Sequence, residues 1–172
     1  MPRQASRIVR RPKTRGRKPP TLSGLKKKAW ALLSECVRRE ASNETYKVRP
    51  MWNGEIVCYT CPTMSGWKEM QAGHAIGGRN GAVLLDEEII RPQCVRCNIM
   101  LRGNYGEFIT RLVRERAAHL PRNPGNLTYT EVLAEAMDWW DGKLSTSRQI
   151  RKWSRSELEE KILGYRERLA KL

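Results

Sequence analysis

Two pairs of cysteines constrain the fold of this chain more than any other feature of its sequence. Cys58 and Cys61 form one Cys-x-x-Cys pair, and Cys94 and Cys97 form the second. Four thiolates with this spacing can surround Zn²⁺ as a tetrahedron and join two segments that are distant in the chain. Because such a site leaves no open coordination position, we expect a structural zinc ion that adds to the folding free energy and does no chemistry.

The fifth cysteine, Cys36, has a different role. It lies on the apolar stripe of an amphipathic helix predicted over residues 22–41, so we interpret it as a small buried hydrophobe. Five cysteines are an odd set for a disulfide framework, and the N-terminal segment lacks the apolar region of a signal peptide. We therefore expect a reducing, cytoplasm-like compartment.

The charge balance points to a polyanionic partner. The chain has 33 Lys and Arg against 18 Asp and Glu, a net charge of +15. Residues 1–20 contain no acidic residue and four prolines, and we expect a disordered basic tail that lies along phosphates. A tail that only aids solubility is the alternative. No apolar run is long enough to cross a membrane.

We predict a mostly helical α+β fold with a small zinc-stabilised core. The expected organisation is the tail over 1–20, a helix and connector over 21–55, the zinc core over 56–120 and a helical region over 121–172. In the core, strands within 56–72 and 82–92 flank a glycine-rich turn at 77–81, and a helix follows the second cysteine pair. That helix breaks near Asn104 and restarts at Phe108. Further helices are predicted over 130–140 and after Ser154, which with Glu157 forms a capping box.

Two residues of this core are candidates for chemistry. His74 ends a predicted strand between the cysteine pairs, and Asn98 directly follows the last cysteine at the start of a predicted helix. If both pairs bind one zinc ion, the strand–turn–strand–helix segment brings His74 and Asn98 to one cleft, as in ββα-metal nucleases. Imidazole can act as a base near neutral pH, and an amide oxygen suits Mg²⁺ or Mn²⁺.

The sequence resembles a known family at this point. Its ordered motifs Cys58-x-x-Cys61, Trp67, Gln71-Ala-Gly-His74, Gln93-Cys94-Val-Arg-Cys97-Asn98 and Gly103-Asn104 are similar to those of the phage NinG/Rap recombination endonucleases, and more loosely of zinc-bearing HNH and endonuclease VII-like enzymes. The resemblance implies a structure-specific endonuclease that cuts branched DNA such as Holliday junctions. It implies that His74 is the general base, that Asn98 binds the catalytic Mg²⁺ or Mn²⁺, and that the four cysteines hold zinc. For a phage-encoded protein, the compartment would be the host-cell cytoplasm.

Two positions depart from the wider HNH pattern. Gly73 stands where an Asp or His usually binds the metal, and Ile89 stands where an Asn usually orients the base. Another oxygen must then replace the missing ligand, and Asp86 is our candidate, with Glu87 and Glu107 as further ones. We expect a backbone carbonyl or another side chain to orient His74.

Several basic residues are candidates for phosphate contacts, because guanidinium matches phosphate oxygens bidentately. They are Arg79, Arg96 and Arg102 in the core and Arg10, Arg11, Lys13, Arg15, Arg17 and Lys18 in the tail.

Three functions remain open from the sequence. The first is a metal-dependent nuclease for branched DNA, the second a zinc-stabilised junction-binding protein without catalysis, and the third an RNA-binding zinc protein. A four-way junction presents two related strands, so a homodimer with two active sites is a further hypothesis. Recombination proteins are additional expected partners, and a membrane is not.

Overall fold

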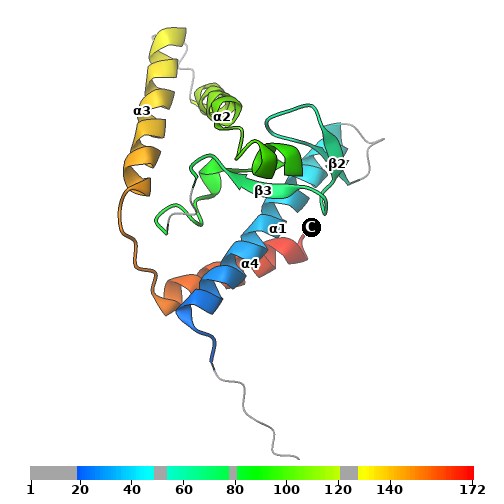
Figure 1. Ribbon diagram of the computed structural model, residues 1–172, viewed down its shortest axis with the longest axis vertical. Coiled ribbons are helices and arrows are strands. Elements are labelled where there is room, and N and C mark those ends of the chain that lie inside the picture. Colours follow the sequence, from blue (N-terminus) through cyan, green and yellow to red (C-terminus); the bar gives the residue numbers. More distant parts are fainter. Residues whose placement is uncertain (1–18, 49–53, 78–80, 121–127) are drawn as a thin grey trace, which may run out of the picture.

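The computed structural model describes residues 19–48, 54–77, 81–120 and 128–172 (Figure 1). Almost all of the basic tail and Arg79 lie outside these residues. The chain is α+β and mostly helical, as predicted, with two small antiparallel sheets. Within the described part, no helix combines the length and apolar character needed to cross a bilayer.

The fold contains two antiparallel strand pairs. Strands β1 (Glu55–Val57) and β2 (Met64–Gly66) form one pair, and β3 (Gln71–His74) and β4 (Ile90–Gln93) form the other. In the second pair Gln71 lies opposite Gln93, and His74 lies opposite Ile90. A five-residue π-helical turn, η2 (Arg96–Met100), follows β4. This segment has the strand–strand–helix order that the sequence predicts.

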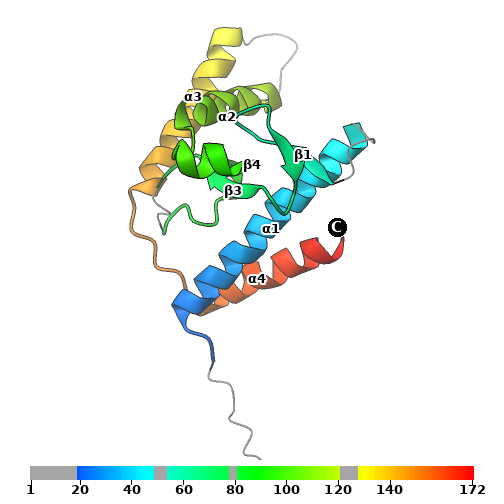
Figure 2. The ribbon, with the colours of Figure 1, turned by 45° about the vertical axis from the view of Figure 1, so that its right-hand side comes forward.

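Two long helices run along one side of the strands. Helix α1 (Leu22–Val48) lies beside α4 (Arg155–Ala170), as Figures 1 and 2 both show. Helix α4 begins at the predicted capping box, in which Ser154 and Glu157 exchange hydrogen bonds. Its residues Leu158, Ile162 and Tyr165 are buried, as the periodicity predicts. The last helix therefore packs on the core of its own chain.

The other side is covered by α2 (Tyr105–His119) and α3 (Tyr129–Ser147), which pack on each other. Phe108 and Leu112 of α2 and Ala136 of α3 are fully or almost fully buried. A second capping box, between Thr128 and Glu131, begins α3.

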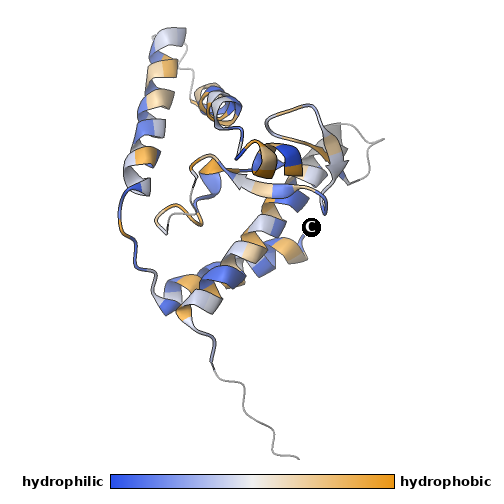
Figure 3. Cartoon of the chain, in the orientation of Figure 1, coloured by the Kyte–Doolittle hydropathy of each residue, from blue (hydrophilic) through white to orange (hydrophobic). Residues whose placement is uncertain are grey.

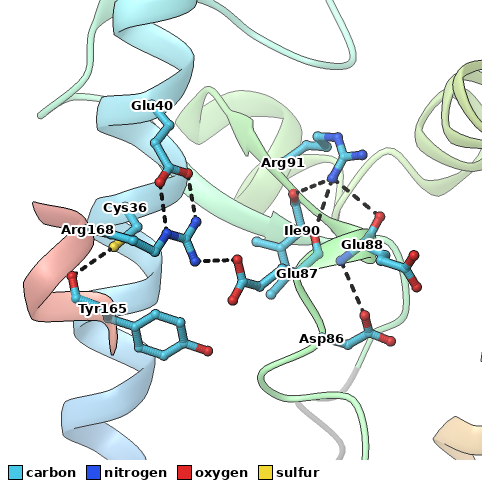
Figure 4. Close-up of polar contacts among 9 residues, drawn as sticks. All are labelled: Cys36, Glu40, Asp86, Glu87, Glu88, Ile90, Arg91, Tyr165 and Arg168. Atoms are coloured by element: carbon cyan, nitrogen blue, oxygen red, sulfur yellow. Dashed lines mark hydrogen bonds and ion pairs between the residues drawn. The ribbon is translucent and has the colours of Figure 1, made fainter. Parts of the chain in front are cut away.

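Arg168 of α4 joins three parts of the fold. Its guanidinium donates to both carboxylate oxygens of Glu40 on α1, at 2.9 and 2.8 Å, and pairs with Glu87 at 2.5 Å (Figure 4). Glu87 belongs to a short 3-10 helix, η1 (Glu87–Ile89), that leads into β4. Cys36 is fully buried nearby, where its thiol contacts the Tyr165 carbonyl, in agreement with its prediction as a core residue. Burial raises the pKa of this thiol to about 11.

Several predicted boundaries were wrong. The first helix reaches Val48 rather than residue 41, and the region 82–89 contains turns and η1 instead of a strand. The helix after the cysteines ends at Met100, and α2 begins at Tyr105 rather than Phe108. Left-handed backbone at Arg102, Gly103 and Asn104 separates the two helices. Helix α3 extends to Ser147, beyond the predicted end at 140.

Candidate functional site

The four predicted cysteines form a cluster that can hold a metal ion. All four sulfur atoms lie within 4.8 Å of one another, and Cys61 Sγ is 3.7 Å from Cys94 Sγ. A tetrahedral Zn–S₄ site with bonds of about 2.3 Å has sulfur–sulfur distances of roughly 3.8 Å. The donor set and its dimensions therefore fit zinc. Cys58, Cys94 and Cys97 are buried, and they pack with Ile56 and Met70 in a small core of their own.

The neighbours of Cys61 favour the ionised form of its thiol. Burial opposes ionisation of Cys61, but hydrogen bonds with the Thr63 hydroxyl and backbone outweigh it and lower the pKa of this thiol to about 6. The Cys61 sulfur lies 3.2 Å from the Thr63 hydroxyl oxygen. Because a metal binds the thiolate, this environment favours coordination at neutral pH.

The first cysteine pair is attached to β4 and to the segment after η2. The Tyr59 amide donates to the Pro92 carbonyl at 2.8 Å, and the Cys94 amide donates to Cys58 Sγ at 3.3 Å. The Asn104 side chain donates to the Thr60 carbonyl at 3.3 Å. These bonds fix η2, and with it Asn98, beside the β3–β4 pair.

His74 is held on two sides at the end of β3. Its ring stacks on Trp30 of α1, with 4.5 Å between centroids and 24° between planes. Its Nε2 lies 3.1 Å from the Leu84 carbonyl oxygen. A neutral imidazole that donates from Nε2 to this carbonyl has its basic lone pair on Nδ1. A backbone carbonyl thus takes the orienting position that Ile89, which is fully buried, cannot fill.

Asn98 is oriented by a second side chain. Its Nδ2 donates to Gln71 Oε1 at 2.6 Å, so its Oδ1 points elsewhere as an acceptor. Asn98 and His74 line the same pocket of about 200 Å³, together with Trp30, Ala72, Ile76, Gly77, Ile99 and Tyr105. The structure therefore brings the two predicted chemical residues to one pocket.

The position of the missing metal ligand is filled from the opposite strand. A Cβ atom on Gly73 would lie 2.0 Å from Gln93 Oε1 and 3.2 Å from Asn98 Oδ1. Gln93 is fully buried, and its Nε2 donates to the Thr60 hydroxyl and to the Gly103 carbonyl, at 2.9 and 2.8 Å. Its Oε1 has no hydrogen-bond partner among the described residues. Residue 73 must be glycine here, and two amide oxygens lie where an acidic side chain would reach.

Asp86 lies elsewhere, contrary to our expectation that it completes this site. Its carboxylate caps η1 by accepting from the Glu88 amide and pairs with Lys143 of α3 at 2.8 Å. Glu87 pairs with Arg168, and Glu107 pairs with Arg111. No acidic residue of the described chain lines the His74 pocket. These carboxylates are engaged in structural ion pairs, which counts against them as ligands of a cation at Asn98.

The candidate phosphate contacts are placed only in part. Arg96 and Arg102 are exposed on η2 and on the turn after it, and neither has an ion-pair partner among the described residues. Arg79 and the tail residues Arg10, Arg11, Lys13, Arg15, Arg17 and Lys18 lie outside the described residues.

Trp30 and Tyr105 line the pocket, and Gln71 and Gln93 lie next to Asn98, but the sequence does not predict the role of any of these four residues. Gln71 and Gln93 are in the family-like motifs, but only the strand register shows that they face each other beside Asn98. Trp30 is 44 residues from His74, and nothing local predicts their stacking. Tyr105 packs closely against Gly77, where a Cβ atom would lie 2.4 Å from the Tyr105 hydroxyl oxygen. This close approach explains the glycine at position 77, but only the folded structure reveals it.

Comparisons with protein-family models, with curated proteins and with solved structures found no match for this chain.

Proposed function

We propose that this protein is a metal-dependent endodeoxyribonuclease that hydrolyses phosphodiester bonds in branched DNA, such as Holliday junctions. The observation that supports it most is the shared pocket of His74 and Asn98, in a chain that also has a four-cysteine cluster able to hold structural zinc. A base and an amide oxygen ligand at one small site, in a chain of net charge +15, suit phosphodiester hydrolysis.

Each residue has a separate role in this proposal. The His74 imidazole accepts the proton of the attacking water, and the Leu84 carbonyl and Trp30 hold the ring in place. Asn98 Oδ1 is the protein ligand for Mg²⁺ or Mn²⁺, and Gln71 fixes its amide. Gln93 Oε1 is a second oxygen in place of the usual carboxylate. A cation held by these oxygens would stabilise negative charge on the scissile phosphate and the leaving oxygen.

The remaining parts of the proposal concern binding. Arg96 and Arg102 contact phosphates near the pocket, and the basic tail contacts phosphates farther away. We keep a homodimer as the arrangement that supplies two active sites to one junction. Recruitment by recombination proteins and a location in the host-cell cytoplasm follow from the family resemblance alone.

One observation favours a second candidate, a zinc-stabilised protein that binds DNA junctions without cutting them. Mg²⁺ sites normally include one or two carboxylates, and the lining of the His74 pocket has none. Such a protein would use the same cysteine cluster and the same basic surface.

A cleavage assay separates the two. Zinc-loaded protein is incubated with a labelled four-way junction or its linear duplex, in Mg²⁺, in Mn²⁺ and without added divalent metal. The nuclease proposal predicts cutting of the junction only with added metal. Tight, salt-sensitive binding without cutting in either metal would support the binding protein instead.

A further inference from the structure

The turn η2 exposes its apolar side chains instead of burying them. Ile99 is 60% exposed and Met100 is 72% exposed, and Val95 and Leu101 on either side are 44% and 43% exposed. Figure 3 shows both apolar and polar colour on the short helical segment between β4 and α2. In α2 and α4, by contrast, most of the apolar residues are buried or partly buried. A cluster of exposed apolar residues indicates an interaction surface for a partner molecule.

The exposure results from how η2 is anchored. Cys97 is fully buried in the cysteine cluster, and Asn98 is bonded to Gln71, so these two residues define the inner face. Backbone bonds from the Asn98 amide to the Cys94 carbonyl and from the Gly103 amide to the Cys97 carbonyl, both 2.9 Å, fix the turn at each end. Ile99 and Met100 are therefore held outward on a rigid support.

The surroundings of this patch indicate the chemistry of its partner. Ile99 lines the His74 pocket, so the patch continues directly into the proposed active site. Arg96 and Arg102 flank it, with no ion-pair partner among the described residues. Apolar side chains between cations match DNA, where the cations contact phosphates and the apolar side chains enter between base steps. An apolar protein partner would leave both guanidinium groups without a counter-charge.

We propose that Ile99 and Met100 form a wedge that inserts between adjacent base pairs of bound DNA, next to the phosphate that is cut. This inference rests on the proposed function, because it requires DNA as the partner. Unstacking a base costs least where pairing is already interrupted. The wedge therefore favours a branch point over continuous duplex and places the branch at the His74 pocket.

The test measures base unstacking without relying on cleavage. The zinc-loaded full chain is bound, without added Mg²⁺ or Mn²⁺, to a four-way junction with 2-aminopurine at the branch. The variant Ile99→Ser/Met100→Ser is compared with Ile150→Ser, which changes a side chain that is 93% exposed outside the patch. Wild type and Ile150→Ser should raise 2-aminopurine fluorescence, and the double variant should not. The double variant should bind the junction about tenfold more weakly.

Salt dependence distinguishes the wedge from the cations beside it. The Ile99→Ser/Met100→Ser variant should keep the slope of log affinity against log salt concentration, because it removes no phosphate contact. The variant Arg96→Gln/Arg102→Gln should lower the magnitude of that slope by about 2.

Four results would overturn the wedge. Junction binding by wild type without a fluorescence change, or an unchanged signal in the double variant, would reject the wedge and leave the proposed nuclease intact. A wild-type dimer that the double variant converts to a monomer, with its DNA affinity kept, would make the patch an interface between copies. Failure of wild type to bind DNA would reject both proposals.

Discussion

At Gly73, the backbone of β3 lies directly against the side chain of Gln93. We expect Gly73→Ala to destabilise the fold by about 1–3 kcal/mol, because the new methyl group would lie 2.0 Å from a buried amide oxygen. Gly66→Ala is the matched control, since nothing lies within 4 Å of its Cβ position, and it should change stability by less than about 1 kcal/mol. Urea denaturation of the zinc-loaded proteins measures both. Equal effects would contradict the close contact.

Glu115 is the residue for which we predict a pH effect. Burial raises the pKa of this carboxyl, but hydrogen bonds from Arg91 and Tyr59 outweigh it and hold the pKa below its ordinary value of 4.5. A lowered pKa in the folded state stabilises the fold above the unfolded-state pKa, and this contribution disappears as pH falls through the folded value.

The corresponding variant is Glu115→Gln. Its free energy of unfolding should be lower than that of wild type at pH 6–7, and the difference should shrink as pH falls below about 4.5. Urea denaturation at a series of pH values measures the difference. A difference that is constant over this range would mean that the Glu115 charge adds nothing to stability.

The sequence predicted the cysteine cluster and the proximity of His74 and Asn98. Both predictions depend on ligand spacing and on the order of the strands, which do not change when the element boundaries are misplaced by a few residues. It did not predict the surroundings of these residues. Asp86 was proposed from its charge and position alone, and its ion pair with Lys143 depends on how α3 packs. The role of Gln93 depends on strand register, which neither composition nor motif spacing specifies.

Among the elements, β1, β2 and η2 depend most on the metal. Their small core contains Ile56, Met70 and three of the cysteines, and little apolar material besides. We expect Cys97→Ser to abolish stoichiometric zinc binding and cooperative unfolding of this region, and Cys36→Ser to retain one zinc ion per chain. Metal analysis and chelator titration followed by circular dichroism measure this. Zinc retention by Cys97→Ser would reject the four-cysteine site.

The packing of α4 on α1 gives a prediction that is independent of the metal. Leu158 is fully buried, and Leu163 on the same helix is 57% exposed. Leu158→Ala should therefore cost about 2–5 kcal/mol of unfolding free energy, and Leu163→Ala about 0.5 kcal/mol. Thermal or urea denaturation compares them. Similar losses would mean that α4 does not pack as described.

The presence of the helices was easier to predict than the residues at which they begin and end. The period of Leu158, Ile162 and Tyr165 and the Ser154 cap identified α4 directly. The break between η2 and α2 was expected at Asn104 and Gly106. Asn104 does lie in the left-handed break, together with Arg102 and Gly103, whereas Gly106 lies inside α2. Gly103 and Asn104 are residue types that favour this conformation, but arginine rarely adopts it, so the local sequence gives no signal for it at Arg102.

At the scale of the whole molecule, the net charge of +15 should dominate DNA affinity. Residues 1–18 contain eight of the basic side chains. Their deletion should reduce the magnitude of the slope of log affinity against log salt concentration by up to about seven, if each cation displaces a counterion. Fluorescence anisotropy from 50 to 300 mM salt measures the slope. An unchanged slope would show that the tail does not contact phosphates.

The most direct test of the central claim is the single-turnover cleavage rate of a four-way junction by His74→Ala. We predict a rate about 10²- to 10⁴-fold below that of wild type, with zinc content and junction affinity unchanged, because the variant lacks only the base. His119→Ala, which removes the other histidine of the chain, should cut like wild type. Cleavage by His74→Ala at the wild-type rate would contradict the account.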